Sequence, residues 1–166
     1  MNIMKPQKTI FLFLALILPI LIFLFLRYFG KNEFAVQPLY VDVYPEARKG
    51  CVTAQTLPYH IPDSIRIQLP LQKDSLVIVS FGEVNAESVN QMNRITEEFE
   101  HDPVERLPLD ISDKTIFWKD CIFFLKDPFD MVLVDRSGAI RGQYVSNDRE
   151  EIDRLITELT IILKKY

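Results

Sequence analysis

The sequence predicts an α/β fold with a central mixed sheet, preceded by one apolar N-terminal helix. Residues 76–81 (LVIVSF) form a nearly continuous run of apolar and β-branched side chains, which is typical of a strand buried on both faces. Residues 130–163 contain two short strand-like runs and then apolar residues at helical spacing, which predicts a hairpin followed by an amphipathic helix. Residues 10–26 are 17 side chains without a charge, so this segment has no face suited to water.

The segment DMVLVDRSGAIRGQYVS, residues 130–146, carries the strongest local signal. Its two strand-forming runs flank a polar turn in which Gly138 can adopt a positive φ angle. Asp148 and the two residues before it offer N-caps for the next helix, and acidic residues in its first turn suit the helix dipole. A hairpin that leads into a terminal amphipathic helix is the second half of a thioredoxin-like domain. We expect this helix to bury one apolar face on the sheet: Ile152, Leu155, Ile156, Leu159 and Leu163.

The remaining elements alternate as expected of a layered α/β domain. Residues 86–100 predict a helix that ends before Pro103, and residues 107–111 predict a short strand that Pro108 confines to an edge or a bulge. A right-handed crossover would place the strand after this helix parallel to residues 76–81. Residues 113–125 fit either a helix or a strand, and we favour the helix. Residues 39–43 and residues 65–68 each show a short strand pattern.

Residues 10–29 are predicted to form a transmembrane signal anchor. The uncharged run and the aromatic residues after Arg27 reach about the length that crosses a bilayer, and no small-residue cleavage site follows. We expect residues 1–9 in the cytoplasm, residues 30–56 as a linker, and residues 57–166 as a periplasmic domain. The chain would then cross a bacterial inner membrane once. A cleaved secretory signal is the alternative.

Composition narrows the function classes. The net charge is −4, and all 23 acidic residues follow residue 30; without a basic patch, nucleic acid is not an expected partner. The two histidines and two cysteines form no spaced pairs of the kind that bind zinc, and no cofactor is expected. Cys51 and Cys121 could form a disulfide in an oxidising compartment. The alternative is two free thiols, which we favour because Cys121 lies in an apolar run.

Three segments resemble one family. VLVDRSGAIRGQYVSNDREEIDRLI (132–156) is similar to the terminal hairpin and helix of the Sco/SenC proteins, which are membrane-anchored, thioredoxin-like copper proteins that assist cytochrome c oxidase assembly. YHIPDSIRI (59–67) resembles the segment that opens their domain, and VIVSFGEVNAESVNQMNRI (77–95) their first strand, metal-binding loop and helix. The resemblance implies a thioredoxin-like fold, and oxidase subunits or assembly factors as partners.

The copper ligands of that family are not matched. The resemblance places its two cysteines at Asn85 and Val89, and its histidine at Asp127. Cu(I) is selected by soft thiolate ligands, which amide, aliphatic and carboxylate side chains do not replace. We therefore expect a degenerate member without a metal site, because the chemistry of a fold resides in its site.

Several other polar residues could take part in a site. His60 could be a ligand, but we expect it to be structural, and Glu83 and Glu87 could stand in a vestigial site, but we expect a solvated loop. Asp127 and Asp130 could accept a metal, but we expect them to serve in turns or caps. The aromatic residues near Trp118 are expected to pack in the core, with an exposed patch for a partner as the alternative: Phe117, Trp118, Phe123 and Phe124.

The resulting functional hypothesis is a non-catalytic, membrane-anchored module that helps to assemble or scaffold a respiratory cytochrome oxidase. One alternative is a thiol–disulfide oxidoreductase that uses Cys51 and Cys121, although neither cysteine lies in the helix-start or cationic context that activates a thiol. The other alternative is a structural protein of the cell envelope.

Overall fold

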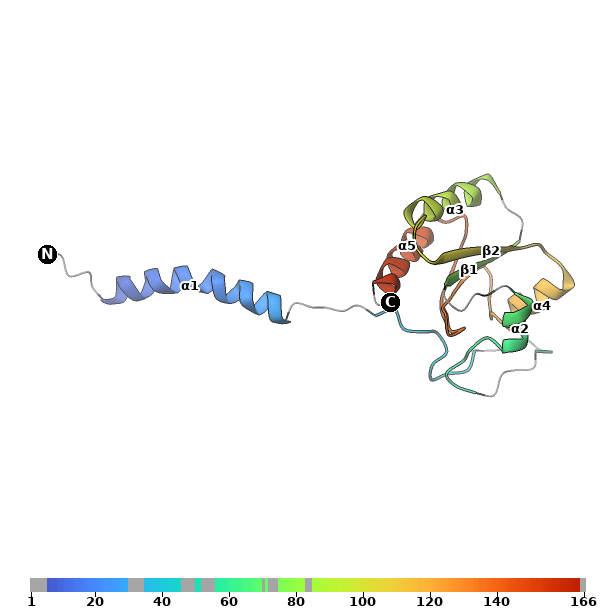
Figure 1. Cartoon of the computed structure of the whole chain (residues 1–166), viewed down its shortest axis with the longest axis horizontal. Helices are drawn as coiled ribbons and strands as arrows, with labels where there is room; N and C mark the ends of the chain where they lie inside the picture. The colour runs from blue at the N-terminus through green and yellow to red at the C-terminus, as the bar shows by residue number, and fades with distance from the viewer. Residues whose placement is uncertain are drawn as a thin grey trace. The chain divides into compact units, whose positions relative to one another are not determined.

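The computed structural model describes residues 6–29, 35–45, 50–51, 56–69, 71, 75–82 and 85–164. The chain divides into two compact units, Met1–Phe34 and Ala35–Tyr166 (Figure 1).

The part of the first unit that the structure describes is the helix α1 (Pro6–Phe29), with Pro19 in its interior. Side chains are described for residues 14–28 of this helix, and nearly all of them are exposed. Among the residues that the structure describes, no helix is both long enough and apolar enough by hydropathy to span a membrane.

The second unit is built on a four-stranded mixed sheet in the order β2-β1-β3-β4. The central strand β1 (Leu76–Phe81) runs parallel to β2 (Val104–Leu109) and antiparallel to β3 (Met131–Val134), and β4 (Ile140–Tyr144) runs antiparallel to β3. The predicted central strand and antiparallel hairpin are therefore confirmed. The predicted edge strand is also present, but it covers Val104–Leu109 instead of residues 107–111. Gly138 in the hairpin turn has a φ of 84°, the positive value that the sequence predicted.

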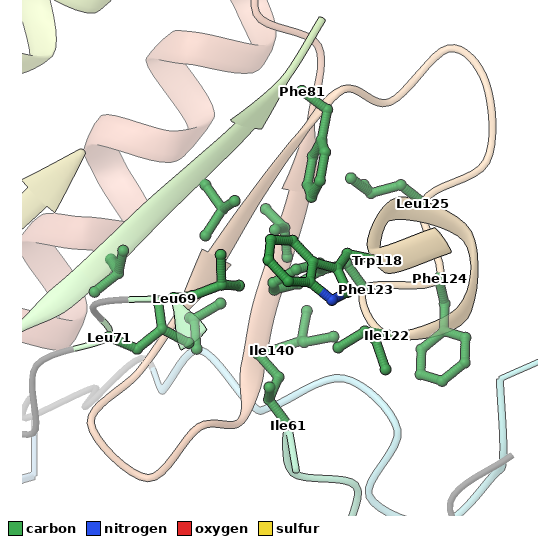
Figure 2. Close-up of a cluster of buried hydrophobic side chains, with 14 of the residues drawn as sticks. Ile61, Leu69, Leu71, Phe81, Trp118, Ile122, Phe123, Phe124, Leu125 and Ile140 are labelled. Carbon is green, nitrogen blue, oxygen red and sulfur yellow. The ribbon is translucent and has the colours of Figure 1, made fainter. Parts of the chain in front are cut away.

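Helices cover both faces of the sheet. In Figure 1, α3 (Ala86–Glu98) and α5 (Arg149–Leu163) lie on one side, and α2 (Asp63–Gln68) and α4 (Asp113–Cys121) on the other. Alternate side chains of a strand point to opposite faces, so β1 contributes to two cores. Its odd-numbered apolar residues join the aromatic cluster under α4 shown in Figure 2, and its even-numbered ones pack with α3 and α5.

The terminal helix α5 largely follows the expected pattern. Asp148 caps it by accepting hydrogen bonds from the backbone N–H of Glu150 and Glu151. Two residues that the sequence placed on the buried face, Ile156 and Leu163, are only half-buried at its border, although both still pack against the core. The fully buried residues of the helix are Ile152, Leu155, Leu159 and Ile162.

Two strand predictions were wrong. Residues 65–68 belong to the helix α2, because Ile65 and Leu69, four residues apart, pack together on the core while Ile67 is exposed. Residues 39–43 form bends rather than a strand; Leu39 N donates to Ile140 O (2.7 Å) and Tyr40 O accepts from Tyr59 N (3.0 Å). The favoured helix at 113–125 is confirmed as far as Cys121, and the apolar residues 122–125 leave the helix while staying buried.

The domain begins earlier than expected, since residues 35–45 belong to the compact unit rather than to a linker. Arg141 Nη1 donates to Val36 O (2.8 Å) and the Tyr40 ring contacts the rings of Tyr59 and Phe124 edge-on. Together with the Leu39–Ile140 hydrogen bond, these contacts cover the outer edge of β4, which would otherwise be open for pairing.

Candidate functional site

A pocket of about 250 Å³ lies where the parallel strands β1 and β2 end. The carboxyl ends of parallel strands are the usual ligand-binding position in open α/β sheets, which makes this pocket the candidate site. The lining comes from the two strand ends, the loop that follows β2, and one side of α4: Phe81, Gly82, Leu109, Asp110, Ile111, Thr115, Ile116 and Lys119.

The loop between β2 and α4 is held in place by a capping box at the start of α4. Ser112 Oγ accepts from Thr115 N (3.2 Å), and Thr115 Oγ1 accepts from Ser112 N (2.7 Å). The same threonine hydroxyl donates to Asp110 O (2.6 Å). Because one side chain bonds both neighbours of Ile111, the backbone at that residue is fixed although its side chain is 65% exposed.

The base of the pocket is apolar, and exposed apolar side chains also line its rim. Phe81 is buried and stacks edge-on against Phe123, with ring centroids 5.4 Å apart (Figure 2). At the rim, Ile111 and Ile116 both line the pocket, and Ile116 is 46% exposed. Exposed side chains of this size that lie together, rather than singly, mark surfaces that bind partners.

Charges of both signs flank the apolar walls. Asp110 is exposed on the loop side, and Lys119 is half-buried on the helix side. Lys119 Nζ lies 3.4 Å from Asp127 Oδ1, an ion pair whose carboxylate is largely exposed. Lys114 Nζ lies 4.6 Å from the centre of the Trp118 ring, on the same helix. The pocket thus offers a hydrogen-bond acceptor and a donor on opposite sides of an apolar floor.

At the three positions where the resemblance placed copper ligands, two side chains have structural roles and one is exposed. Asn85 caps α3 by accepting from Ser88 N and Ser88 Oγ, both at 2.7 Å. Val89 is an exposed aliphatic residue on the same helix, and Asp127 forms the ion pair with Lys119. Among the described residues, no three histidine, cysteine, aspartate or glutamate side chains form a group that could hold a metal ion. The donors at these positions do not fit copper.

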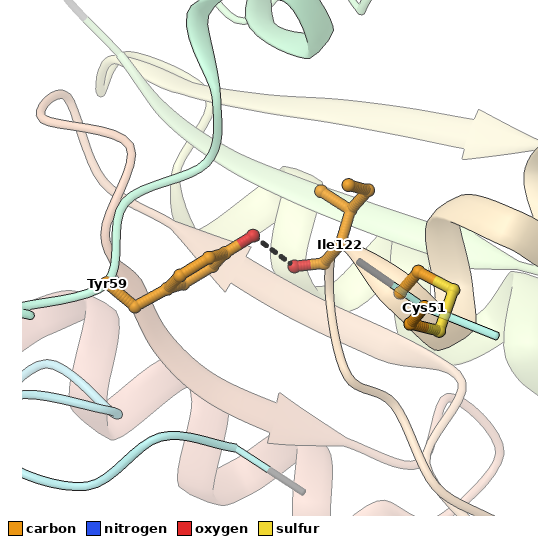
Figure 3. Close-up of a disulfide and its surroundings, with 4 residues drawn as sticks. Cys51, Tyr59 and Ile122 are labelled. Carbon is orange, nitrogen blue, oxygen red and sulfur yellow. Dashed lines mark hydrogen bonds between the residues drawn. A yellow bond between two sulfur atoms is a disulfide. The ribbon is translucent and has the colours of Figure 1, made fainter. Parts of the chain in front are cut away.

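Cys51 and Cys121 form a disulfide, with Cα atoms 5.2 Å apart (Figure 3). The free-thiol interpretation that we favoured from the sequence was therefore wrong; an apolar sequence context does not distinguish a buried thiol from a buried disulfide. Cys121 is the last residue of α4. Beside it, the buried Tyr59 hydroxyl donates to Ile122 O (2.9 Å), so a covalent and a polar contact hold the segments before α2 against the end of α4.

The other sequence candidates do not converge on a site. His60 is exposed with a ring nitrogen 3.0 Å from Pro58 O, and Glu87 accepts from Gln91 Nε2 (2.6 Å) within α3. Asp130 accepts from Ser146 N (2.7 Å) and Oγ (2.6 Å), so it joins the start of β3 to the chain after β4 rather than serving the expected turn or helix cap. Glu83 lies outside the described residues. The aromatic group divides: Trp118, Phe123 and Phe124 are buried, whereas Phe117 is at the surface.

Sequence reasoning missed most of the pocket. Asp110, Ile111 and Ile116 were not singled out, because a single isoleucine looks the same whether it faces the core or solvent. The Ser112-x-x-Thr115 spacing was the one local signal, since it resembles a capping box that orders a helix start.

No protein-family model matches this chain, and no curated protein is significantly similar to it.

Proposed function

We propose that this protein is a non-catalytic, membrane-anchored binding module with a thioredoxin-like domain, and that it helps to assemble or scaffold a respiratory cytochrome oxidase outside a bacterial inner membrane. One observation carries the proposal: the best-placed pocket of the domain has apolar walls, while the positions that match family copper ligands hold Asn85, Val89 and Asp127 in capping, surface and ion-pair roles. The site is suited to binding rather than to metal chemistry.

The thioredoxin-like assignment is supported by the topology. A parallel pair crossed by α3, followed by an antiparallel hairpin and the terminal helix α5, gives the sheet order β2-β1-β3-β4 with helices on both faces. The segments that resemble the Sco/SenC family supply β1 with α3, and β3 with β4 and α5. The oxidase-assembly role follows from that resemblance.

The anchor is supported by the sequence. Residues 10–26 carry no charge, and α1 extends from Pro6 to Phe29. A continuous apolar run of this length matches the hydrocarbon core of a bilayer when the flanking aromatic residues are included. We propose a single pass with Ala35–Tyr166 on the periplasmic side.

The position of the cysteines disfavours the oxidoreductase alternative. An attacking thiolate is normally stabilised at a helix N-terminus or beside a cation. Cys121 instead ends α4, where the helix dipole is negative, and Cys51 is its disulfide partner. We propose a structural role for this bond.

A gene deletion with complementation tests the proposal. Deletion should lower the amount of assembled cytochrome oxidase, measured by its haem absorbance and oxygen consumption in isolated membranes, and the Cys51→Ser/Cys121→Ser double variant should restore it if it folds. Affinity capture of the full chain from detergent-solubilised membranes should enrich oxidase subunits or assembly factors. Normal oxidase content in the deletion strain, with no respiratory subunit captured, would favour the structural envelope alternative.

A further inference from the structure

We propose that the pocket at the ends of β1 and β2 binds an extended peptide segment of a protein partner, which inserts one large apolar side chain between Ile111 and Ile116. This inference rests on the proposed function and identifies the surface through which the module would act.

The size of the pocket favours an anchoring side chain. Pockets for small molecules and cofactors usually measure about 300–1,000 Å³, whereas this one measures about 250 Å³. Protein interfaces commonly concentrate their binding energy in one or a few large side chains that fill pockets of a partner. A single leucine or aromatic residue, with part of its backbone, suits the available space better than a cofactor.

The surroundings of the pocket extend the apolar surface. Within the described residues of Ala35–Tyr166, eight large apolar side chains are exposed, and three of them are Ile111, Ile116 and Phe117. Two of these three line the pocket itself. Ile111 and Ile116 therefore expose apolar surface at the pocket itself, and a partner that bound there would remove this surface from water.

The rim is ordered before any partner arrives. The capping box of Ser112 and Thr115, with the bond from Thr115 to Asp110 O, fixes the loop that carries Ile111. Ile116 is held by the first turns of α4, whose buried face packs through Trp118. Binding to a preorganised surface loses less conformational entropy than binding to a mobile loop.

The charges indicate a peptide rather than a lipid chain. Asp110 and Lys119 present an acceptor and a donor at the pocket. A peptide backbone carries an N–H and a C=O on each residue, so an extended segment can satisfy both while its side chain enters the apolar floor. An acyl chain has neither group and could fill only the apolar floor. A peptide can also donate to Asp110 and accept from Lys119, whose ammonium has three donors and uses one with Asp127.

Peptide selection on the full chain tests this inference. A phage-displayed library of random peptides is panned against the full-length protein in lipid nanodiscs, and the affinities of the selected peptides are measured on the same particles. The expected result is a shared large apolar residue and a loss of affinity of about tenfold or more in Ile116→Asp and in Ile111→Ser. The matched control is Ile67→Ser on α2, an exposed isoleucine outside the pocket, which should bind as wild type.

The outcomes separate the candidate occupants. Peptides without an apolar consensus, or with affinities unchanged in both pocket variants, would overturn the inference. The inference would also fall if lipid or a second copy of the chain bound at the same rim. Binding to nanodiscs that lack the protein, or self-association, would then be lost in the pocket variants. Both variants replace exposed side chains, and circular dichroism should show that they fold. If they restore the oxidase fully in the deletion strain, the inference fails while the proposed function stands.

Discussion

The ring of Tyr144 occupies the space beside Gly142 on β4 that a side chain at position 142 would need. A Cβ atom at position 142 would lie 2.1 Å from the Tyr144 hydroxyl oxygen and 2.5 Å from the carbon that bears it. The ring cannot move away easily, because it is fully buried, donates to Glu158 Oε2 (2.5 Å) and lies 4.4 Å from the Arg154 guanidinium carbon. A glycine here is therefore required by packing rather than by a positive φ angle.

Gly142→Ala should lower the free energy of unfolding by about 1–3 kcal/mol, the usual cost of forcing atoms into a packed core. Urea unfolding of the Ala35–Tyr166 unit measures this. A suitable control is Glu97→Ala on α3, which replaces an exposed side chain without a steric conflict. Unchanged stability of Gly142→Ala would mean that the Tyr144 ring has another position available to it.

Asp135 organises the turn between β3 and β4. Its carboxylate accepts from Ser137 N (2.9 Å) and Ala139 N (2.9 Å), and Arg141 Nε donates to its other oxygen (2.7 Å). Burial alone would raise the pKa of this carboxyl, but the hydrogen bonds from Ser137 and Ala139 and the charge of Arg141 outweigh burial and hold its pKa below the ordinary value of 3.8.

A lowered pKa in the folded state means that ionised Asp135 stabilises the fold at a pH above the unfolded value. This contribution is lost as the pH falls from about 3.8 through the folded pKa. Asp135→Asn should lower stability at neutral pH by about 3 kcal/mol, because Arg141 loses its charged partner, and should flatten the acid limb of the stability–pH curve. Urea midpoints measured from pH 7 down to acid pH test this, and an acid limb as steep as that of wild type would assign it to other carboxylates.

β2 is an edge strand of the sheet. Among the described residues, no segment pairs with its outer edge. Hydrogen bonds from Leu76 N to Pro103 O and from Gly82 N to Leu109 O show that odd-numbered positions face β1. Pro108 therefore faces outward, where its missing N–H removes a donor that another strand could use. Val104 N is occupied by Asp102 O (2.7 Å). The open edge is thereby a poor template for pairing.

Pro108→Thr should restore an outward N–H and increase self-association of the domain. Sedimentation velocity over a concentration series measures this as a rise in average mass. Glu105→Thr is the matched control, because it places the same residue on the same strand at a position whose N–H faces β1. Equal association of the two variants would show that Pro108 does not protect the edge.

The sequence predicted the central strand, the hairpin and the two long helices because each has a local apolar pattern. The pattern is a continuous run in β1, short strand-forming runs in β3 and β4, and helical spacing in α3 and α5. The prediction failed for α2, whose Ile-Arg-Ile alternation looks like a strand until Ile65 and Leu69 meet the core. It failed for residues 35–45, because their packing depends on Arg141, about a hundred positions later. The pocket was missed for the same reason: the exposure of Ile116 is set by how α4 packs, not by its neighbours in the chain.

At the scale of the whole molecule, the Cys51–Cys121 disulfide closes a loop across the first half of the domain, with a sequence separation of 70. A loop of that length should contribute about 4 kcal/mol by restricting the unfolded chain. Dithiothreitol should therefore lower the urea midpoint of wild type and have no effect on Cys51→Ser, which is preferable to a change at the more buried Cys121. A wild-type midpoint that is insensitive to complete reduction would show that the bond adds no stability.

The N-terminal unit should hold the protein in the membrane through the uncharged run 10–26. A lysine at the centre of a membrane-spanning helix costs about 2.5–3.5 kcal/mol of insertion free energy, whereas a lysine near its end can extend to the interface. Leu18→Lys should therefore reduce the fraction of the full chain that sediments with membranes after carbonate washing, and Tyr28→Lys should leave it nearly unchanged. The same two variants test whether the anchor is needed for function. Leu18→Lys should fail to restore the oxidase in the deletion strain, and Tyr28→Lys should restore it. If Leu18→Lys stays in the membrane fraction as fully as Tyr28→Lys, α1 does not cross the bilayer as a central, lipid-facing helix.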